Sequence, residues 1–229
     1  SKDIGPNRHN GIGGAYQIGF DGSSSNTLLK FDKCTFIGNK ADYEGGALAV
    51  QTKKRVNVLD CTFIENKAGF KSKSSSANLL ADIENMGCGG AIYIDPDYSN
   101  QDSEKMPLFE IANTNFTRNE ADNGHGIYIR GGSTTSLTVT DNCAFEDNGK
   151  DGTVILSECN NLDVSSDTVF TYTNESDTTR PRPFDVAGNT DATFENLVIE
   201  NSLPTSKPNE GNALHFNSNV NYALVRNCT

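Results

Sequence analysis

The heptapeptide CTFIGNK at residues 34–40 returns almost unchanged as CTFIENK at residues 61–67. Weaker copies, FTRN, FEDN and FTYTN, keep the aromatic residue of the phrase. The Phe residues that mark the copies are Phe36, Phe63, Phe116, Phe145 and Phe170, at intervals of 27, 53, 29 and 25 residues. The interval of 53 corresponds to one unit plus an insert. Self-similarity at a fixed period indicates a repeat architecture, in which each unit buries its apolar face against its neighbours.

Each unit reads as a short alternating strand, a turn, Cys/Thr-x-Phe-x-x-Asn, a linker, Gly-Gly-Ala and a second alternating strand. Val56 and Val58 point to one side of the first strand, and Ile92 and Ile94 to one side of the second. Units of this length predict an all-β fold, a parallel β-helix (solenoid) of about six to seven coils with loop inserts. A propeller blade needs a longer unit, and the Leu spacing of leucine-rich repeats is missing.

Stacked coils place equivalent side chains in columns about 4.8 Å apart. We expect the Phe residues to form one core column. The small residues two positions earlier form a second column, and Asn residues three positions later a corner column. The second column is Cys34, Cys61, Thr114, Cys143, Thr168 and Cys228. The Asn column is Asn39, Asn66, Asn119 and Asn148, and the Gly pairs at 13–14, 45–46 and 89–90 mark another corner.

The alternation of FIGN, FIEN, FTRN and FEDN with GGAY, GGAL and GGAI resembles the FxxN and GGA-I/L/V signature of chlamydial polymorphic outer-membrane protein repeats. The resemblance is good over residues 13–148 and weak beyond. It implies a right-handed parallel β-helix at the cell surface or in secreted form, often an adhesin. Family resemblance bears on the fold more directly than on the function.

The net charge of −11 argues against nucleic acid as a partner, because phosphate binding needs clustered Lys and Arg. The apolar runs are too short to cross a bilayer, so no membrane insertion by this segment is expected. No metal or cofactor is predicted. His9, His125 and His215 are isolated and expected at the surface. The acidic loop at residues 95–104 is the best Ca²⁺ candidate, but it lacks EF-hand spacing and reads as a solvated loop.

The strand after the Gly corner supplies the candidate binding residues. Tyr128 and Arg130 are expected to face outward beside Tyr93 and Asp95 of the preceding coil. The predicted outward column is Tyr93, Tyr128, Ile155, Asp185 and His215. Two stacked tyrosines could form a platform for a sugar or a protein. A plain strand surface with a weak Asp95–Arg130 pair is the alternative.

The oxidation state of the cysteines and the use of the N-glycosylation triplets depend on the cellular compartment. Cys34 and Cys61 fall on adjacent coils, within disulfide range, yet free buried thiols fit the column equally well. The triplets at Asn115, Asn174 and Asn227 are glycosylation sites if the source is a eukaryotic secretory pathway, which would make the chain a glycoprotein. The inserts at residues 69–86, 96–107, 174–181 and 204–210 are candidates for partner contact, and residues 78–86 could form a short helix.

We therefore expect residues 1–229 to form one β-helix domain, a fragment of a longer repeat protein. The expected role is that of a non-enzymatic adhesin or stalk, extracellular or at the cell surface, which binds a partner protein or glycan. One alternative is a structural filament component that self-associates end to end, since open strand edges invite pairing. The other is a carbohydrate-active, pectate-lyase-like β-helix enzyme.

Overall fold

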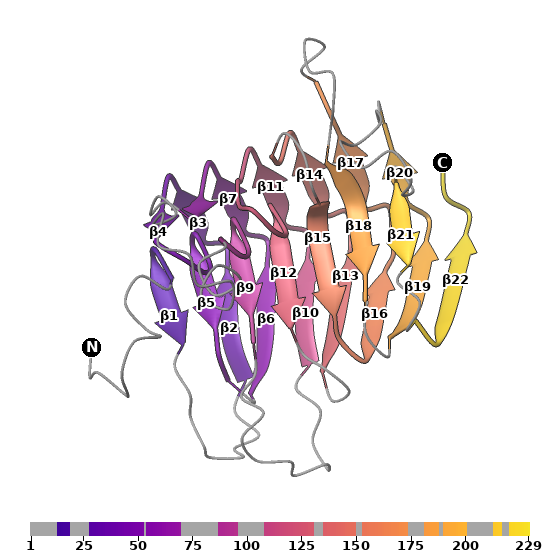
Figure 1. Ribbon diagram of the computed structural model, residues 1–229, viewed down its shortest axis with the longest axis horizontal. Helices are drawn as coiled ribbons and strands as arrows, with labels where there is room; N and C mark the ends of the chain where they lie inside the picture. Colours follow the sequence, from indigo (N-terminus) through magenta and orange to yellow (C-terminus); the bar gives the residue numbers. More distant parts are fainter. Residues whose placement is uncertain are drawn as a thin grey trace, which may run out of the picture.

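The protein is a parallel β-solenoid without helices in its described part (Figure 1). The computed structural model describes residues 13–18, 28–52, 54–69, 87–95, 108–130, 135–149, 153–173, 181–187, 190–200, 213–216 and 220–229. The expected helix at residues 78–86, most of the four inserts, His9 and Asn174 lie outside these residues. The prediction of an all-β parallel solenoid is confirmed.

Three long sheets run along the solenoid, and every strand pairs in parallel with its equivalent on the next coil. Sheet A contains β1 (Tyr16–Ile18), β5 (Leu48–Val50), β9 (Ile92–Ile94), β12 (Ile127–Arg130), β15 (Thr153–Glu158), β18 (Arg182–Val186) and β21 (Leu214–Phe216). Sheet B contains β2 (Leu28–Asp32), β6 (Arg55–Leu59), β10 (Leu108–Ala112), β13 (Ser136–Thr140), β16 (Asn161–Val164), β19 (Asp191–Glu195) and β22 (Tyr222–Arg226). Sheet C contains β3 (Thr35–Ile37), β7 (Thr62–Ile64), β11 (Asn115–Thr117), β14 (Ala144–Glu146), β17 (Val169–Thr171) and β20 (Val198–Ile199).

Each coil passes from sheet B to sheet C and then to sheet A. Two short strands, β4 (Lys40–Ala41) and β8 (Lys67–Ala68), pair at the corner between sheets C and A. The solenoid has about five turns, slightly fewer than the six to seven coils predicted. Sheet C has six strands in the described residues, where the other two sheets have seven, because β1 and β22 belong to incomplete coils.

The Phe column is confirmed as a stack of parallel rings in the core. Successive rings from Phe36 to Phe170 lie with centroids 4.6–5.0 Å apart and planes within 8° of parallel. Phe63 and Phe116 are fully buried. The coil spacing sets the ring spacing, which explains why the same residue type returns at the same place in the unit.

The Cys/Thr column is a slot for a small side chain that can both donate and accept a hydrogen bond. The Cys61 thiol donates to the Leu59 carbonyl at 3.2 Å, and the Thr114 hydroxyl donates to the Ala112 carbonyl at 2.8 Å. The backbone N–H of Cys61 in turn donates to Thr114 Oγ1 at 3.3 Å. Both side-chain types satisfy the tight turn that precedes sheet C, so Cys and Thr alternate freely in this column.

The Asn column forms the predicted ladder of amides along one corner. Asn119 donates through Nδ2 to Asn148 Oδ1 at 2.9 Å and to the Phe63 carbonyl at 3.0 Å. Its Oδ1 accepts from both the backbone N–H and the Nδ2 of Asn66. Asn39 donates to Asn66 in the same way. The buried amides thus satisfy one another and the backbone of the previous coil.

The Gly-Gly corner is dictated by two different constraints. Gly45 and Gly89 have φ angles of +63° and +67°, a region that favours glycine. Gly46 is needed for space, because a Cβ there would lie 1.9 Å from the Gly90 carbonyl oxygen of the next coil. The GGA signature therefore combines a turn with close backbone contact between coils.

His125 replaces the second Gly of that corner, and its expected place at the surface was wrong. Its side chain is buried, with 4% exposed, and Nδ1 accepts a hydrogen bond from the Ala121 N–H at 3.1 Å. The ring occupies the space above Gly149, where a Cβ would lie 2.2 Å from the imidazole. An imidazole can enter this corner because a glycine on the next coil leaves room for it.

Candidate interaction face on sheet A

The outer face of sheet A brings together the candidate residues of neighbouring coils. Tyr93 lies opposite Tyr128, and Arg130 lies opposite Glu158 on the next strand. The predicted column was wrong at one position. Ile155 pairs with Ile127 in the fully buried core, and Leu156 takes the outward place next to Tyr128. The mismatch arises because β15 is longer than the other strands of the sheet, so its register was read one residue out of phase.

Tyr93 points outward but is not open to solvent. Only 2% of its surface is exposed, and the neighbouring outward residue Ala49 is fully buried. The Tyr93 hydroxyl donates to Asp95 Oδ2 at 2.9 Å. Burial, followed by the nearby charges of Glu44 and Asp95, raises the pKa of the phenol. The expectation of a platform of two exposed tyrosines was therefore wrong, because the Tyr93 side chain is buried.

Tyr128 forms the accessible side of this cluster. Its ring is half-buried and lies 5.6 Å from the Tyr93 ring with a tilt of 51°. Burial, then the carboxylate of Glu158, raises the pKa of its hydroxyl. A tilted pair with one open ring offers an edge and a hydroxyl to a partner rather than a stacking surface.

Arg130 is the exposed cation of the face. Its guanidinium lies in the field of carboxylates on both neighbouring coils, Asp95 on one side and Glu158 on the other. Partial burial opposes its charge, but the attraction of Asp95 and Glu158, with that of the two tyrosines, raises the pKa overall. The stack Asp95, Arg130 and Glu158 is therefore a strip of alternating charge across three coils.

Glu44 and Cys88 belong to the same cluster and were missed by sequence reasoning. They take equivalent places on neighbouring coils. The backbone of Glu44 forms an isolated parallel β-bridge with Cys88, and Cys88 forms one with Asn123 on the next coil. Burial, then Glu44, raises the pKa of the Cys88 thiol to about 12. Both residues directly precede a Gly-Gly pair in the sequence, and this shared position was the available signal.

Asp185 and His215 extend the face toward the last coils. They pair in register, and His215 Nδ1 lies 3.0 Å from Asp185 Oδ1. Both side chains keep some solvent exposure, 28% for His215 and 19% for Asp185. The structure thus confirms that these two outward residues meet, as the repeat register predicted.

The remaining candidates are placed as follows. Cys34 and Cys61 are free thiols, like the other four cysteines, so the structure has the free-thiol alternative rather than the disulfide. Asn115 and Asn227 are exposed, and Asn115 lies on the outer face of sheet C. In the described ranges, no group of three or more His, Cys, Asp or Glu side chains could hold a metal ion. The same residues contain no helix long and apolar enough to cross a membrane.

Comparison with protein families agrees with the register of the coils. The repeat of the Chlamydia polymorphic membrane protein matches residues 33–51 and 60–95. These two segments contain both CTFI phrases and the corners GGAL and GGAI. Searches of curated proteins and of solved structures returned no match. The family is one of surface-associated proteins that are generally not enzymes. Residues 33–51 and 60–95 therefore match the repeat of the Chlamydia polymorphic membrane protein, and they lie within a parallel β-solenoid.

Proposed function

We propose that this chain is a non-enzymatic interaction module of an extracellular or surface protein, an adhesin or stalk that binds a protein or glycan of another surface. The observation that supports the proposal is that inward and corner residues of the repeat hold the coils together, whereas outward residues do not. Inward and corner residues are committed to ladders that hold the coils together, as the Phe, Cys/Thr and Asn columns are. Only outward residues vary from coil to coil, so recognition falls to them.

The strip of Asp95, Arg130 and Glu158, with Tyr128 beside it, is the proposed contact. Arg and Tyr are the residue types that dominate interaction energies, because each combines a large surface with directed hydrogen bonds. Arg130 is the exposed member, and the nearby carboxylates of Asp95 and Glu158 favour its charged form. A partner that offers a carboxylate, a sugar hydroxyl pair or a carbonyl edge would fit this arrangement.

Binding to a glycan array and to intact cell surfaces tests the proposal. We expect Arg130→Ala and Tyr128→Ala each to weaken binding about tenfold, the effect of losing one dominant contact. Arg118→Ala is the matched control: Arg118 is also exposed, lies on a different face of the solenoid and pairs with Glu65 at 2.9 Å. Equal losses in all three variants would show that the strip has no special role.

The carbohydrate-active alternative is tested separately. The same face holds carboxylates and a cation together, as polysaccharide-processing sites do, so the wild-type chain should be incubated with acidic and neutral polysaccharides. Product release that disappears in Arg130→Ala would overturn the non-enzymatic assignment. Binding without product release is the expected result.

A further inference from the structure

The outer face of sheet C carries no charged side chain on its central strands, and we propose that it is a docking surface for a second copy of this chain. The face lies along the side of the solenoid, and its centre, β7 and β11, has a coil on either side. Two copies would meet face to face through this sheet, with their coils in opposite order.

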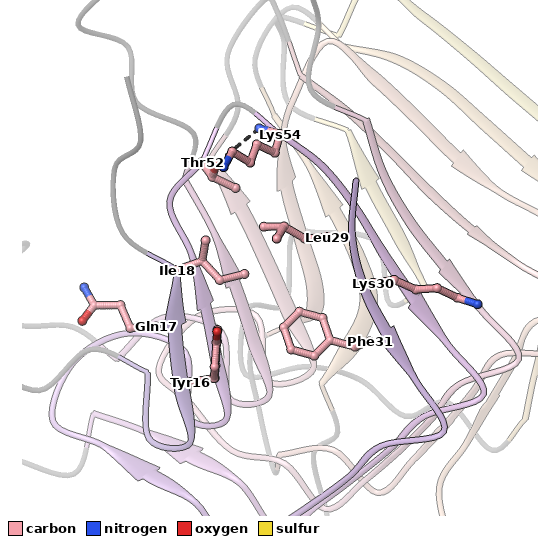
Figure 2. Close-up of a pocket in the computed structure, with 8 residues that line it drawn as sticks. All are labelled: Tyr16, Gln17, Ile18, Leu29, Lys30, Phe31, Thr52 and Lys54. Atoms are coloured by element: carbon pink, nitrogen blue, oxygen red, sulfur yellow. Dashed lines mark hydrogen bonds between the residues drawn. The ribbon is translucent and has the colours of Figure 1, made fainter. Parts of the chain in front are cut away.

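Alternation along each strand decides which side chains reach the outside of the solenoid. Figure 2 shows this for β2, where Leu29 and Phe31 point into the space between the sheets and Lys30 points away. In sheet C each Phe takes the inward place, so the residues on either side of it face outward. The first outward column is Thr35, Thr62, Asn115, Ala144, Val169 and Val198, and the second is Ile37, Ile64, Thr117, Glu146 and Thr171.

These two columns differ from the rest of the surface in their lack of charge. Only Glu146 among them is charged, although 21% of all residues are. On the outer face of sheet B, by contrast, every strand except β13 carries at least one charged side chain. Rows of uncharged, mostly β-branched residues about 4.8 Å apart are the kind of surface that two sheets bury when they pack face to face.

Charged residues flank this face at the corner where each coil leaves sheet C. Glu65 and Arg118 take equivalent places on successive coils, directly after β7 and β11. Lys67 and Glu120 do the same two residues further on. Arg118 pairs with Glu65 at 2.9 Å and Lys67 with Glu120 at 3.0 Å, and all four side chains stay between 37% and 57% exposed. Each of these charges can therefore meet a second partner.

The order of the charges is self-complementary. A two-fold axis along the strands, midway between β7 and β11, brings the coil of β7 opposite the coil of β11 of the second copy. Glu65 then meets Arg118 of the second copy, and Lys67 meets Glu120. At the other corner of sheet C, Lys33 and Asp141 lie one coil further out on either side, and they meet as well. Opposite charges thus face each other at both edges of the contact.

Other arrangements of the two copies bring like charges together. A two-fold axis along the solenoid keeps the coil order, and it places Asp60 opposite Glu65. An axis centred on β7 places Lys67 opposite its own copy, and an axis centred on β11 does the same with Arg118. Ion pairs at the rim contribute little affinity, but repulsion between like charges selects against the wrong orientation.

The face itself fits the selected arrangement. Thr62 lies opposite Asn115 of the second copy, so a hydroxyl and an amide can exchange hydrogen bonds there. Ile64 lies opposite Thr117 in the same way. One coil further out, Ile37 lies opposite Glu146, whose aliphatic stem can cover it while the carboxylate reaches the rim. The contact is isologous, so it closes on itself and gives a dimer and nothing larger.

Sedimentation equilibrium of the 229-residue chain tests the proposal, with circular dichroism to check that each variant keeps its β-structure. The mean mass of the wild-type chain should rise with concentration from 24.7 kDa toward twice that value and no further. Ile64→Arg places a charge at the centre of the face and should shift dimerisation to at least about tenfold higher concentration. Thr138→Arg is the matched control and should dimerise like the wild type, since Thr138 is half-buried on the outer face of sheet B.

An exchange of charges gives the decisive result. Glu65→Lys and Arg118→Glu each place like charges across the contact, so each variant alone should dimerise at least about tenfold more weakly than the wild type. A mixture of the two should form a mixed dimer, because each copy offers the charge that the other lacks. A wild-type chain that stays monomeric, growth beyond the dimer, a mixture no stronger than its components, or dimerisation unchanged in Ile64→Arg would each overturn the proposal.

The dimer contact lies on a different sheet from the strip of Asp95, Arg130 and Glu158 on sheet A. Binding at that strip is measured at concentrations where the chain is monomeric, so Arg118→Ala remains a control there. The two proposals are therefore tested separately, and either can fail without the other.

Discussion

At the residue scale, the fold rests on side chains that satisfy identical neighbours. Asn119 takes part in four hydrogen bonds to adjacent coils through its side chain, two as donor and two as acceptor. It is fully buried, so these bonds have no competition from water. In a low-dielectric corner such a ladder is strong when complete and costly when one member is removed.

Replacing Asn119 with Leu should lower the free energy of unfolding by about 3 kcal/mol, because the Asn66 N–H and the Phe63 carbonyl lose their partners in a buried place. Urea denaturation measures the change. Asn39→Leu is the control, since Asn39 is half-buried and donates into the ladder at its first rung. The free energy of unfolding should fall clearly less in Asn39→Leu than in Asn119→Leu. Equal losses at the two positions would argue against a cooperative ladder.

The buried thiols make a second prediction at this scale. Burial raises the pKa of both Cys143 and Cys159 to about 11, from an ordinary value of 9.0. The folded state therefore holds these protons more tightly than the unfolded state does. Their contribution to stability is complete below pH 9 and is lost as the pH rises from 9 toward 11.

Urea titrations at increasing pH should show this loss of stability at alkaline pH. Cys143→Thr should make the loss smaller, because Thr does not ionise in this range and a Thr side chain, Thr114, already fills the equivalent place on the previous coil. In the native state at neutral pH, both thiols should resist alkylation by iodoacetamide. Rapid native labelling of Cys143 or Cys159 would contradict the assignment.

At the element scale, the strands are too short to be stable alone, and the corners set their register. Gly38, Glu65, Arg118 and Asp147 occupy one corner with φ angles between +50° and +63°. Side chains of several types are accepted there, because they point to solvent. The Gly-Gly corner differs, since the backbone of one coil touches that of the next at Gly46.

We expect Gly46→Ala to destabilise the solenoid by more than 2 kcal/mol, in the range of ~2–4, because its Cβ meets a backbone carbonyl that cannot move without displacing a coil. Gly38→Asn is the matched control: nothing lies within 4 Å of a Cβ at Gly38, and Asn tolerates positive φ. Thermal unfolding of the two variants measures the difference. A similar loss for both would show that the close backbone contact between coils at Gly46 does not explain the need for glycine there.

At the scale of the whole molecule, the repeat predicted the solenoid and its three columns, because each inward residue meets its own equivalent and periodicity alone identifies it. The outer face was predicted less well. Tyr93 was expected at the surface and is closed, and Ile155 was placed one residue out of register. Alternation says which way a side chain points, but not what lies above it. The repeat pattern also could not predict the burial of His125, because that burial depends on the space that Gly149 leaves on the next coil.

The direction of the Asn ladder has a consequence for how such a chain can grow. Within the ladder, the Nδ2 groups of Asn39, Asn66 and Asn119 each donate to the Asn Oδ1 of the next coil. A coil copied in the gene and inserted beside its parent therefore finds a donor on one side and an acceptor on the other, with a Phe ring above and below. The near-identical residues 34–40 and 61–67 occupy equivalent places on adjacent coils, as two such copies would. The length of the solenoid can thus change in steps of one whole coil, and no new packing contacts are needed.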